Sequence, residues 1–105
     1  MSITTHVLDT SRGRPAEGVP VVLERAAGDG WDAVGRGATD ADGRARELGW
    51  AGAGRYRLTF DTGAYLGEAA FYPRVTVEFR VEDGEGRYHL PLLLNPFGYS
   101  TYRGS

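Results

Sequence analysis

Apolar and polar residues alternate with a period of two along most of the chain, which is the pattern of β-strands that bury one face. The clearest example spans residues 75–82, where valines and a phenylalanine alternate with threonine, glutamate and arginine. Residues 55–60 repeat the pattern, with three apolar side chains on one face. Alternation between turn-forming clusters predicts further strands over residues 3–9, 19–25, 31–37, 87–94 and 98–103, and a short extended piece over residues 44–48.

A helical period is almost absent from the sequence. The one predicted helix covers residues 62–71, and the Tyr72-Pro73 pair ends it because proline cannot continue a helix. Seven or eight short strands with one short helix predict an all-β fold, an antiparallel β-sandwich. The length of 105 residues fits a single domain, 1–105, with one modest core. We therefore expect any sizeable pocket to lie between subunits.

Two of the predicted strands carry apolar residues on both faces. In residues 87–94, a tyrosine and three leucines occupy one face, yet the opposite face holds Leu93 beside His89. Residues 3–9 show the same feature, with His6 on the second face. An apolar second face predicts burial against another subunit. If these two strands are neighbours, His6 and His89 share that surface.

The composition excludes several classes of protein. The chain has no Cys, which rules out a disulfide scaffold, a thiolate nucleophile and a Cys-ligated metal site. A net charge of −2 does not indicate a nucleic-acid binder. No apolar run approaches the roughly 18 residues of a membrane span, and the first residues do not resemble a signal peptide. We expect a cytoplasmic protein with no nucleic-acid or membrane partner.

The two histidines are the clearest candidates for acid–base chemistry near neutral pH. Each is also compatible with a plain surface or interface residue. Zinc would need a third ligand, and no His-x-His or His-Glu-x-x-His spacing occurs, so we expect no metal. Arg44, after the Asp42-Gly43 turn, suits an anionic or carbonyl-rich ligand or is simply solvated. Neither a Gly-x-Ser-x-Gly motif nor a paired-carboxylate arrangement is present.

Four segments carry motifs that occur together in one known family. They are residues 5–9 (THVLD), 39–44 (TDADGR), 88–94 (YHLPLLL) and 99–105 (YSTYRGS). In this order they resemble the 5-hydroxyisourate hydrolases, the transthyretin-like enzymes of urate breakdown. The resemblance covers essentially the whole chain, and the Tyr-Arg-Gly-Ser tail is the family's most specific signature.

The resemblance implies a transthyretin-like β-sandwich of two four-stranded sheets with one short helix. It implies a homotetramer, a dimer of dimers, with active sites at the dimer–dimer interface. The implied reaction opens the ring of the small-molecule substrate 5-hydroxyisourate with water, giving 2-oxo-4-hydroxy-4-carboxy-5-ureidoimidazoline without a cofactor. His6, Arg44 and His89 match the catalytic residues of the family. The matching substrate-binding residues are His6, Arg44, Tyr102 and Ser105.

One position departs from the family pattern. Members often have a histidine two residues before the second catalytic histidine, where this chain has Arg87. The difference leaves the His–Arg–His set intact and changes the local charge, and with it the expected pH dependence.

Two functions of other classes compete with the hydrolase. A transthyretin-like carrier would bind an aromatic ligand without turning it over, and an interaction module would stay monomeric. Transthyretin lacks the His–Arg–His set and the tail, so the resemblance favours the enzyme. Decay of 5-hydroxyisourate and the mass in solution distinguish the three.

Overall fold

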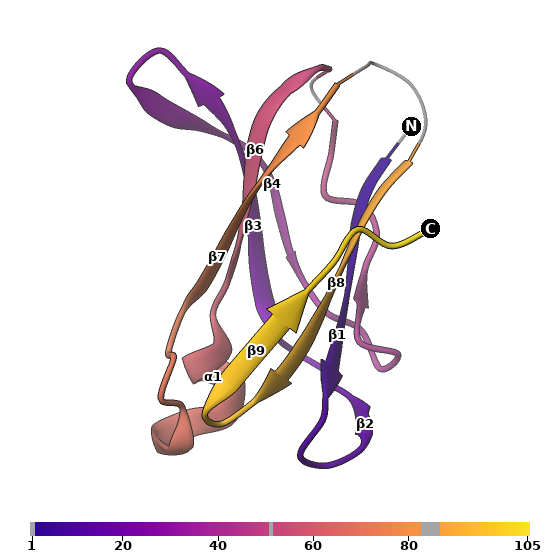
Figure 1. Ribbon diagram of the computed structural model, residues 1–105, viewed down its shortest axis with the longest axis vertical. Coiled ribbons are helices and arrows are strands. Elements are labelled where there is room, and N and C mark those ends of the chain that lie inside the picture. Colours follow the sequence, from indigo (N-terminus) through magenta and orange to yellow (C-terminus); the bar gives the residue numbers. More distant parts are fainter. Residues whose placement is uncertain (1, 51, 83–86) are drawn as a thin grey trace.

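The computed structural model describes residues 2–50, 52–82 and 87–105, and the turn expected over residues 83–86 lies outside them (Figure 1). Within these residues the chain forms nine strands and two short helices. The strands are β1 (Ser2–Asp9), β2 (Arg14–Pro15), β3 (Pro20–Ala27), β4 (Gly30–Ala38), β5 (Arg44–Ala45), β6 (Gly54–Phe60), β7 (Val75–Val81), β8 (Arg87–Asn95) and β9 (Gly98–Thr101). The helices are α1 (Thr62–Leu66) and the 3₁₀ helix η1 (Gly67–Ala69).

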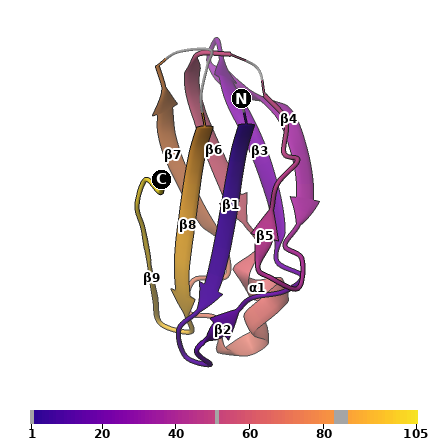
Figure 2. The same ribbon diagram turned by 90° about the vertical axis from the view of Figure 1, so that its right-hand side faces the viewer.

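The strands form two layers, so the predicted β-sandwich is confirmed. One sheet has the order β2-β1-β8-β9, and the other has the order β4-β3-β6-β7. The first sheet has a fifth strand, because the two-residue strand β5 also pairs with β1. Figure 2 looks onto the outer face of this sheet, where β9, β8, β1 and β5 lie side by side.

One strand pair departs from the predicted antiparallel arrangement. Strands β1 and β8 run parallel, with Thr4 opposite His89 and His6 opposite Pro91, whereas the other pairs within the described residues are antiparallel (Figure 1). Period-two alternation reports which side chains share a face and says nothing of strand direction, so the sequence pattern could not show this. The parallel register sets the geometry of the site described below.

The core lies between the two inner faces and follows the predicted alternation. On β1 the inward side chains are buried, and the outward ones, which include His6, are half-buried. On β6 the inward Tyr56, Leu58 and Phe60 are fully buried. Burying one large apolar side chain stabilises the folded state by roughly 1.5–3 kcal/mol, so these three side chains help to hold the two sheets together. The radius of gyration is 13.2 Å.

The helix is shorter than the sequence predicts. It begins after Asp61, whose carboxylate accepts a hydrogen bond from the amide of Ala64 at 3.0 Å, and α1 ends at Leu66. Gly67 adopts a φ of 70°, a left-handed conformation that stops an α-helix, and the 3₁₀ turn follows. Within the described residues, no helix has the length and apolar character needed to cross a membrane.

One predicted strand and the predicted extended piece are only partly strand in the structure. Residues 44–48 form a strand only at Arg44–Ala45, since Leu48 turns into the core and is 2% exposed. Residues 98–103 form a strand only at Gly98–Thr101, after which the tail runs beside β8.

Candidate active site

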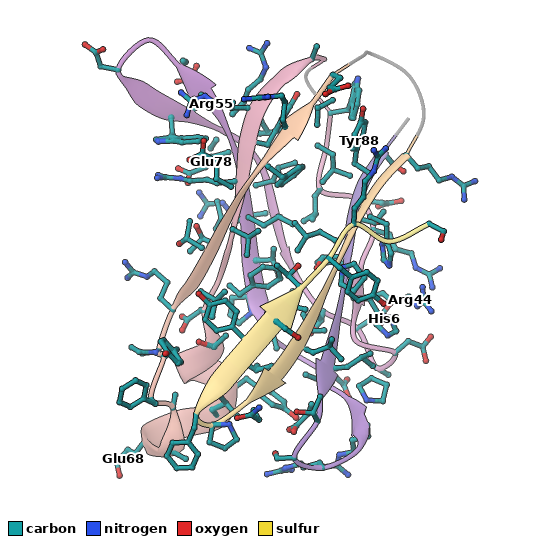
Figure 3. All side chains as sticks on the ribbon, viewed as in Figure 1. His6, Arg44, Arg55, Glu68, Glu78 and Tyr88 are labelled. Carbon is teal, nitrogen blue, oxygen red and sulfur yellow. The ribbon has the colours of Figure 1, made fainter. Side chains whose placement is uncertain are left out.

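His6 and Arg44 lie directly opposite one another on β1 and β5. Asp40 sets this register, because its carboxylate accepts hydrogen bonds from the amides of Asp42 at 2.9 Å and Arg44 at 3.0 Å. Gly43 closes the turn at a φ of 78°, where an added Cβ would lie 2.4 Å from the Val7 carbonyl oxygen. The turn motif that the sequence singled out therefore aims Arg44 at β1. Figure 3 shows His6 and Arg44 on the same side of the sandwich.

The hydrogen bond of His6 fixes its tautomer. Its Nε2 lies 2.8 Å from the backbone oxygen of Asp42. A carbonyl oxygen can only accept, so Nε2 carries the proton and donates. In the neutral ring the lone pair is then on Nδ1, and His6 has one nitrogen able to accept a proton.

His89 lies on the neighbouring strand and is held on two sides. Its Nδ1 is 2.7 Å from the hydroxyl of Thr4, and its backbone oxygen accepts a 2.7 Å hydrogen bond from the amide of Gly104. Burial lowers the pKa of His89 below its ordinary 6.5, and the charges of His6 and Arg44 lower it further. The ring is therefore neutral at pH 7, as a proton acceptor must be.

The two imidazoles share one surface, because their strands are the neighbours that the sequence analysis required for this. Their ring centroids are 6.5 Å apart, with an angle of 33° between the planes. This is a distance at which one water molecule or one small planar ligand can touch both rings. The parallel pairing of β1 and β8 produces it, because it places His89 opposite Thr4, two residues from His6 on the same outward face of β1.

A cleft of about 390 Å³ opens beside His89 and Arg44 on the outer face of the sheet. Its lining residues are Ser2, Thr4, Thr5, Arg44, Arg46, Arg87, His89 and Ser105. Three guanidinium groups face it, and no lining residue is acidic. In the described parts of the chain, none of the three arginines forms an ion pair with a carboxylate. Cations, hydroxyls and a neutral imidazole suit an oxygen-rich or anionic ligand.

The structure separates the two predicted tail residues. Ser105 lines the cleft, whereas Tyr102 lines a neighbouring apolar hollow of about 230 Å³ together with Val77 and Phe79. His89 borders both spaces. His6 is not among the residues that line the cleft, and it reaches the site only through its position beside Arg44 and His89.

The sequence reasoning missed Thr4, Arg46 and Gly104 as members of the site. Thr4 lies on the outward face of β1 with His6, and the alternation predicts this. Its pairing with His89 depends on which strands are neighbours, and the alternation does not predict that. Gly104 was seen only as part of the tail motif. Its contact with the His89 ring depends on how the tail crosses β8. In residues 2–50, 52–82 and 87–105, no three His, Asp or Glu side chains gather in a way that could hold a metal ion.

Comparison with solved structures defines the class of this sandwich. Sea bream transthyretin in complex with thyroxine matches with a TM-score of 0.90 at 34% identity, over 97% of this chain and 93% of that one. The 5-hydroxyisourate hydrolase of Klebsiella pneumoniae matches with a TM-score of 0.86 at 41% identity, over 99% and 98%. The fold is thus transthyretin-like, and the backbone alone does not separate a carrier from an enzyme.

Comparison of sequences identifies the family. The model of the HIUase/Transthyretin family matches residues 3–104, and the chain belongs to this family. A 5-hydroxyisourate hydrolase of Salmonella typhimurium is 44% identical over 110 residues, which cover 98% of this chain and 80% of that protein.

Proposed function

We propose that this protein is a 5-hydroxyisourate hydrolase acting in urate catabolism. It would open the ring of 5-hydroxyisourate with water to give 2-oxo-4-hydroxy-4-carboxy-5-ureidoimidazoline. One observation carries the proposal: His6, Arg44 and His89 come together on one outer face, in a family whose relatives at 41–44% identity have this name. The proposal treats residues 1–105 as one hydrolase domain and needs no cofactor.

The proposed chemistry uses the two imidazoles and the guanidinium of these three residues. Water adds to a ring carbonyl carbon, a C–O bond forms, and the ring C–N bond breaks. One neutral imidazole accepts a proton from the water and, as the imidazolium, returns it to the leaving nitrogen, while the lone pair of the other imidazole can hold the water by accepting its second hydrogen. Arg44 stabilises the negative charge that grows on the carbonyl oxygen. General acid–base catalysis of this kind raises the reaction rate roughly 10²–10⁴-fold.

The remaining proposed contacts lie on either side of His89. Ser105 lines the cleft and supplies a hydroxyl to the substrate. Tyr102 borders the apolar hollow, so it contacts a ligand that extends past His89. Tyr102 is 58% exposed in the single chain, which leaves its ring accessible to substrate.

Two surfaces support the proposed homotetramer, a dimer of dimers with sites at the dimer–dimer interface. The outer face around His6 and His89 carries the half-buried Leu8 and Leu93. A second surface lies at the edge strand β9, where Tyr99 is 42% exposed and Phe97, just before the strand, is 77% exposed. Apolar surface of this kind and an unpaired strand edge are both features of subunit contacts.

Sedimentation equilibrium should give four times the chain mass, and a monomer would count against both the enzyme and the carrier. The cytoplasmic location stays a prediction.

The test of the function is the ultraviolet decay of freshly generated 5-hydroxyisourate with and without the protein. Wild type should accelerate the decay, and His6→Ala and Arg44→Ala should lose the acceleration while remaining folded. Arg74→Ala, an exposed arginine beside the other sheet, is the matched control and should keep full activity. Full activity in both site variants would refute the assignment.

The second candidate is a carrier, favoured by the TM-score of 0.90 to a transthyretin whose structure contains thyroxine. A carrier would bind an aromatic ligand saturably and leave the decay unchanged. The same assay, run beside a binding titration, separates the two functions.

A further inference from the structure

The hydroxyl of Thr4 is placed to control the imidazole of His89. The two residues are direct partners in the parallel register of β1 and β8, and Thr4 Oγ1 lies 2.7 Å from Nδ1 of the ring. In the part of the chain that the structure describes, this hydroxyl has no other hydrogen-bond partner. A β-branched side chain on a strand has few χ1 rotamers, so the hydroxyl is held where it is.

The opposite side of the ring is also constrained. The main chain of Gly104 passes so close that an added Cβ would lie 2.6 Å from Cδ2 of His89 and 3.3 Å from Cγ. With Thr4 at Nδ1 and the tail against the ring carbons, the imidazole has little freedom to turn. Nε2 is then the ring nitrogen left for a ligand.

The electrostatics of the cleft favour one tautomer. Arg44, Arg46 and Arg87 surround the space that His89 lines. Their charges favour a lone pair on Nε2 over an N–H bond, whose positive end would face them. The proton is then on Nδ1, and the Thr4 hydroxyl accepts its hydrogen bond.

We propose that Thr4 is a positioning residue that holds His89 in the Nδ1–H tautomer and so presents the Nε2 lone pair to the reacting water. The proposal deepens the proposed hydrolase function and rests on it. A neutral hydroxyl in this role differs from a carboxylate, which would stabilise the charged ring. With threonine as its partner, His89 stays an uncharged acceptor that holds the proton only during turnover.

The test compares variants that keep or remove the hydroxyl. Thr4→Val keeps the shape and the β-branch, whereas Thr4→Ser keeps the hydroxyl. The matched control is Thr76→Val, which removes an exposed strand hydroxyl from the other sheet. We expect Thr4→Val to lower kcat about 10- to 100-fold with little change in KM, and Thr4→Ser to restore most of it. Thr76→Val should match wild type. Where Thr4→Val does not fold, Thr4→Ala replaces it.

A second readout does not depend on turnover. The ¹⁵N shifts of the imidazoles report the tautomer directly, and with only two histidines a His6→Gln variant assigns both rings. Wild type should show Nδ1–H at His89, and Thr4→Val should lose this preference.

The outcomes separate the two hypotheses. Nε2–H in wild-type His89, unchanged kcat in Thr4→Val, or equal losses in Thr4→Val and Thr4→Ser would each overturn the role of Thr4. If wild type does not accelerate the decay at all, the hydrolase function fails. In that case the tautomer shifts still show whether Thr4 sets the state of His89.

Discussion

The main chain of Gly104 lies against the imidazole of His89. Its amide donates a 2.7 Å hydrogen bond to the His89 backbone oxygen, and the pair forms an isolated antiparallel bridge. A Cβ at this position would lie 2.6 Å from the ring. The tail thus needs glycine here because the ring occupies the space a side chain would take.

We expect Gly104→Ala to displace the His89 ring and reduce turnover about 10- to 100-fold, because small misplacements of a catalytic group are costly. Folding should be little affected, since the bridge is a single contact outside the named strands. The decay assay and circular dichroism measure the two effects. Gly30→Ala is the matched control, because an added Cβ there meets nothing within 4 Å. Wild-type turnover in Gly104→Ala would show that the tail does not constrain the ring.

The pH dependence of activity should reflect the lowered pKa of His89. Burial lowers this pKa first, followed by the charges of His6 and Arg44. The ring must be neutral to accept a proton. In a plot of kcat/KM against pH, the midpoint of the acid limb should therefore lie below pH 6.5, the ordinary pKa of histidine. His6→Gln removes one of the repelling charges, so an NMR titration of that variant should show a higher pKa for His89. A pKa unchanged by the substitution would mean that the two rings do not interact.

The sequence predicted which residues share a face and could not predict which strands are neighbours. Alternation placed His6 and His89 on outward faces because buried and exposed positions differ in polarity. The 6.5 Å separation of their rings follows from the parallel pairing of β1 with β8, a long-range relationship with no local signal. Thr4 was invisible for the same reason, because a threonine on an outward face is ordinary until its partner is known.

The sequence predicted that a turn precedes Arg44. The Asp-x-Asp-Gly sequence has residues typical of a tight turn, and the structure uses Asp40 and Gly43 in the expected way. The length of the helix was not predictable from its apolar residues, because Gly67 stops it through its backbone conformation.

Asp9 should make stability depend on pH in the acid range. Its side chain is 1% exposed, and it accepts hydrogen bonds from Ser11 at 2.6 Å and from the hydroxyl of Tyr65 at 2.7 Å. Burial acts to raise its pKa, but the hydrogen bonds from Ser11, Tyr65 and Arg12 lower it below 3.8 overall. A lowered folded-state pKa means that the stabilisation is complete above the unfolded-state value and is lost as pH falls through the folded-state value.

We expect Asp9→Ala to reduce the free energy of unfolding by about 2–3 kcal/mol at pH 7, because the buried donors lose a charged acceptor. Its stability should also vary less with pH in the acid range than that of wild type. Urea unfolding at a series of pH values measures both effects. Asp32→Ala, on an exposed strand position, should change the free energy of unfolding by less than about 0.5 kcal/mol. Equal pH slopes in Asp9→Ala and wild type would exclude Asp9 as the source.

The exposed arginines of the cleft should contribute to binding rather than to the chemical step. Arg46 and Arg87 line the cleft beside Arg44, and neither forms an ion pair with a described carboxylate. We expect Arg87→Gln and Arg46→Gln each to raise KM about two- to fivefold with little change in kcat, consistent with roughly 0.3–1 kcal/mol for an exposed charge. The difference from wild type should shrink as salt rises from about 0.01 to 0.15 M, because screening weakens exposed charges.

Arg74→Gln is the matched control for this charge effect, because it removes an arginine that lines a hollow on the other sheet. It should leave KM and its salt dependence unchanged. Steady-state kinetics at the two salt concentrations measure both quantities. A loss in kcat without a change in KM would instead place Arg87 or Arg46 with Arg44, stabilising the transition state. An equal rise in KM for Arg74→Gln would mean that the net charge of the protein, and not the cleft, attracts the substrate.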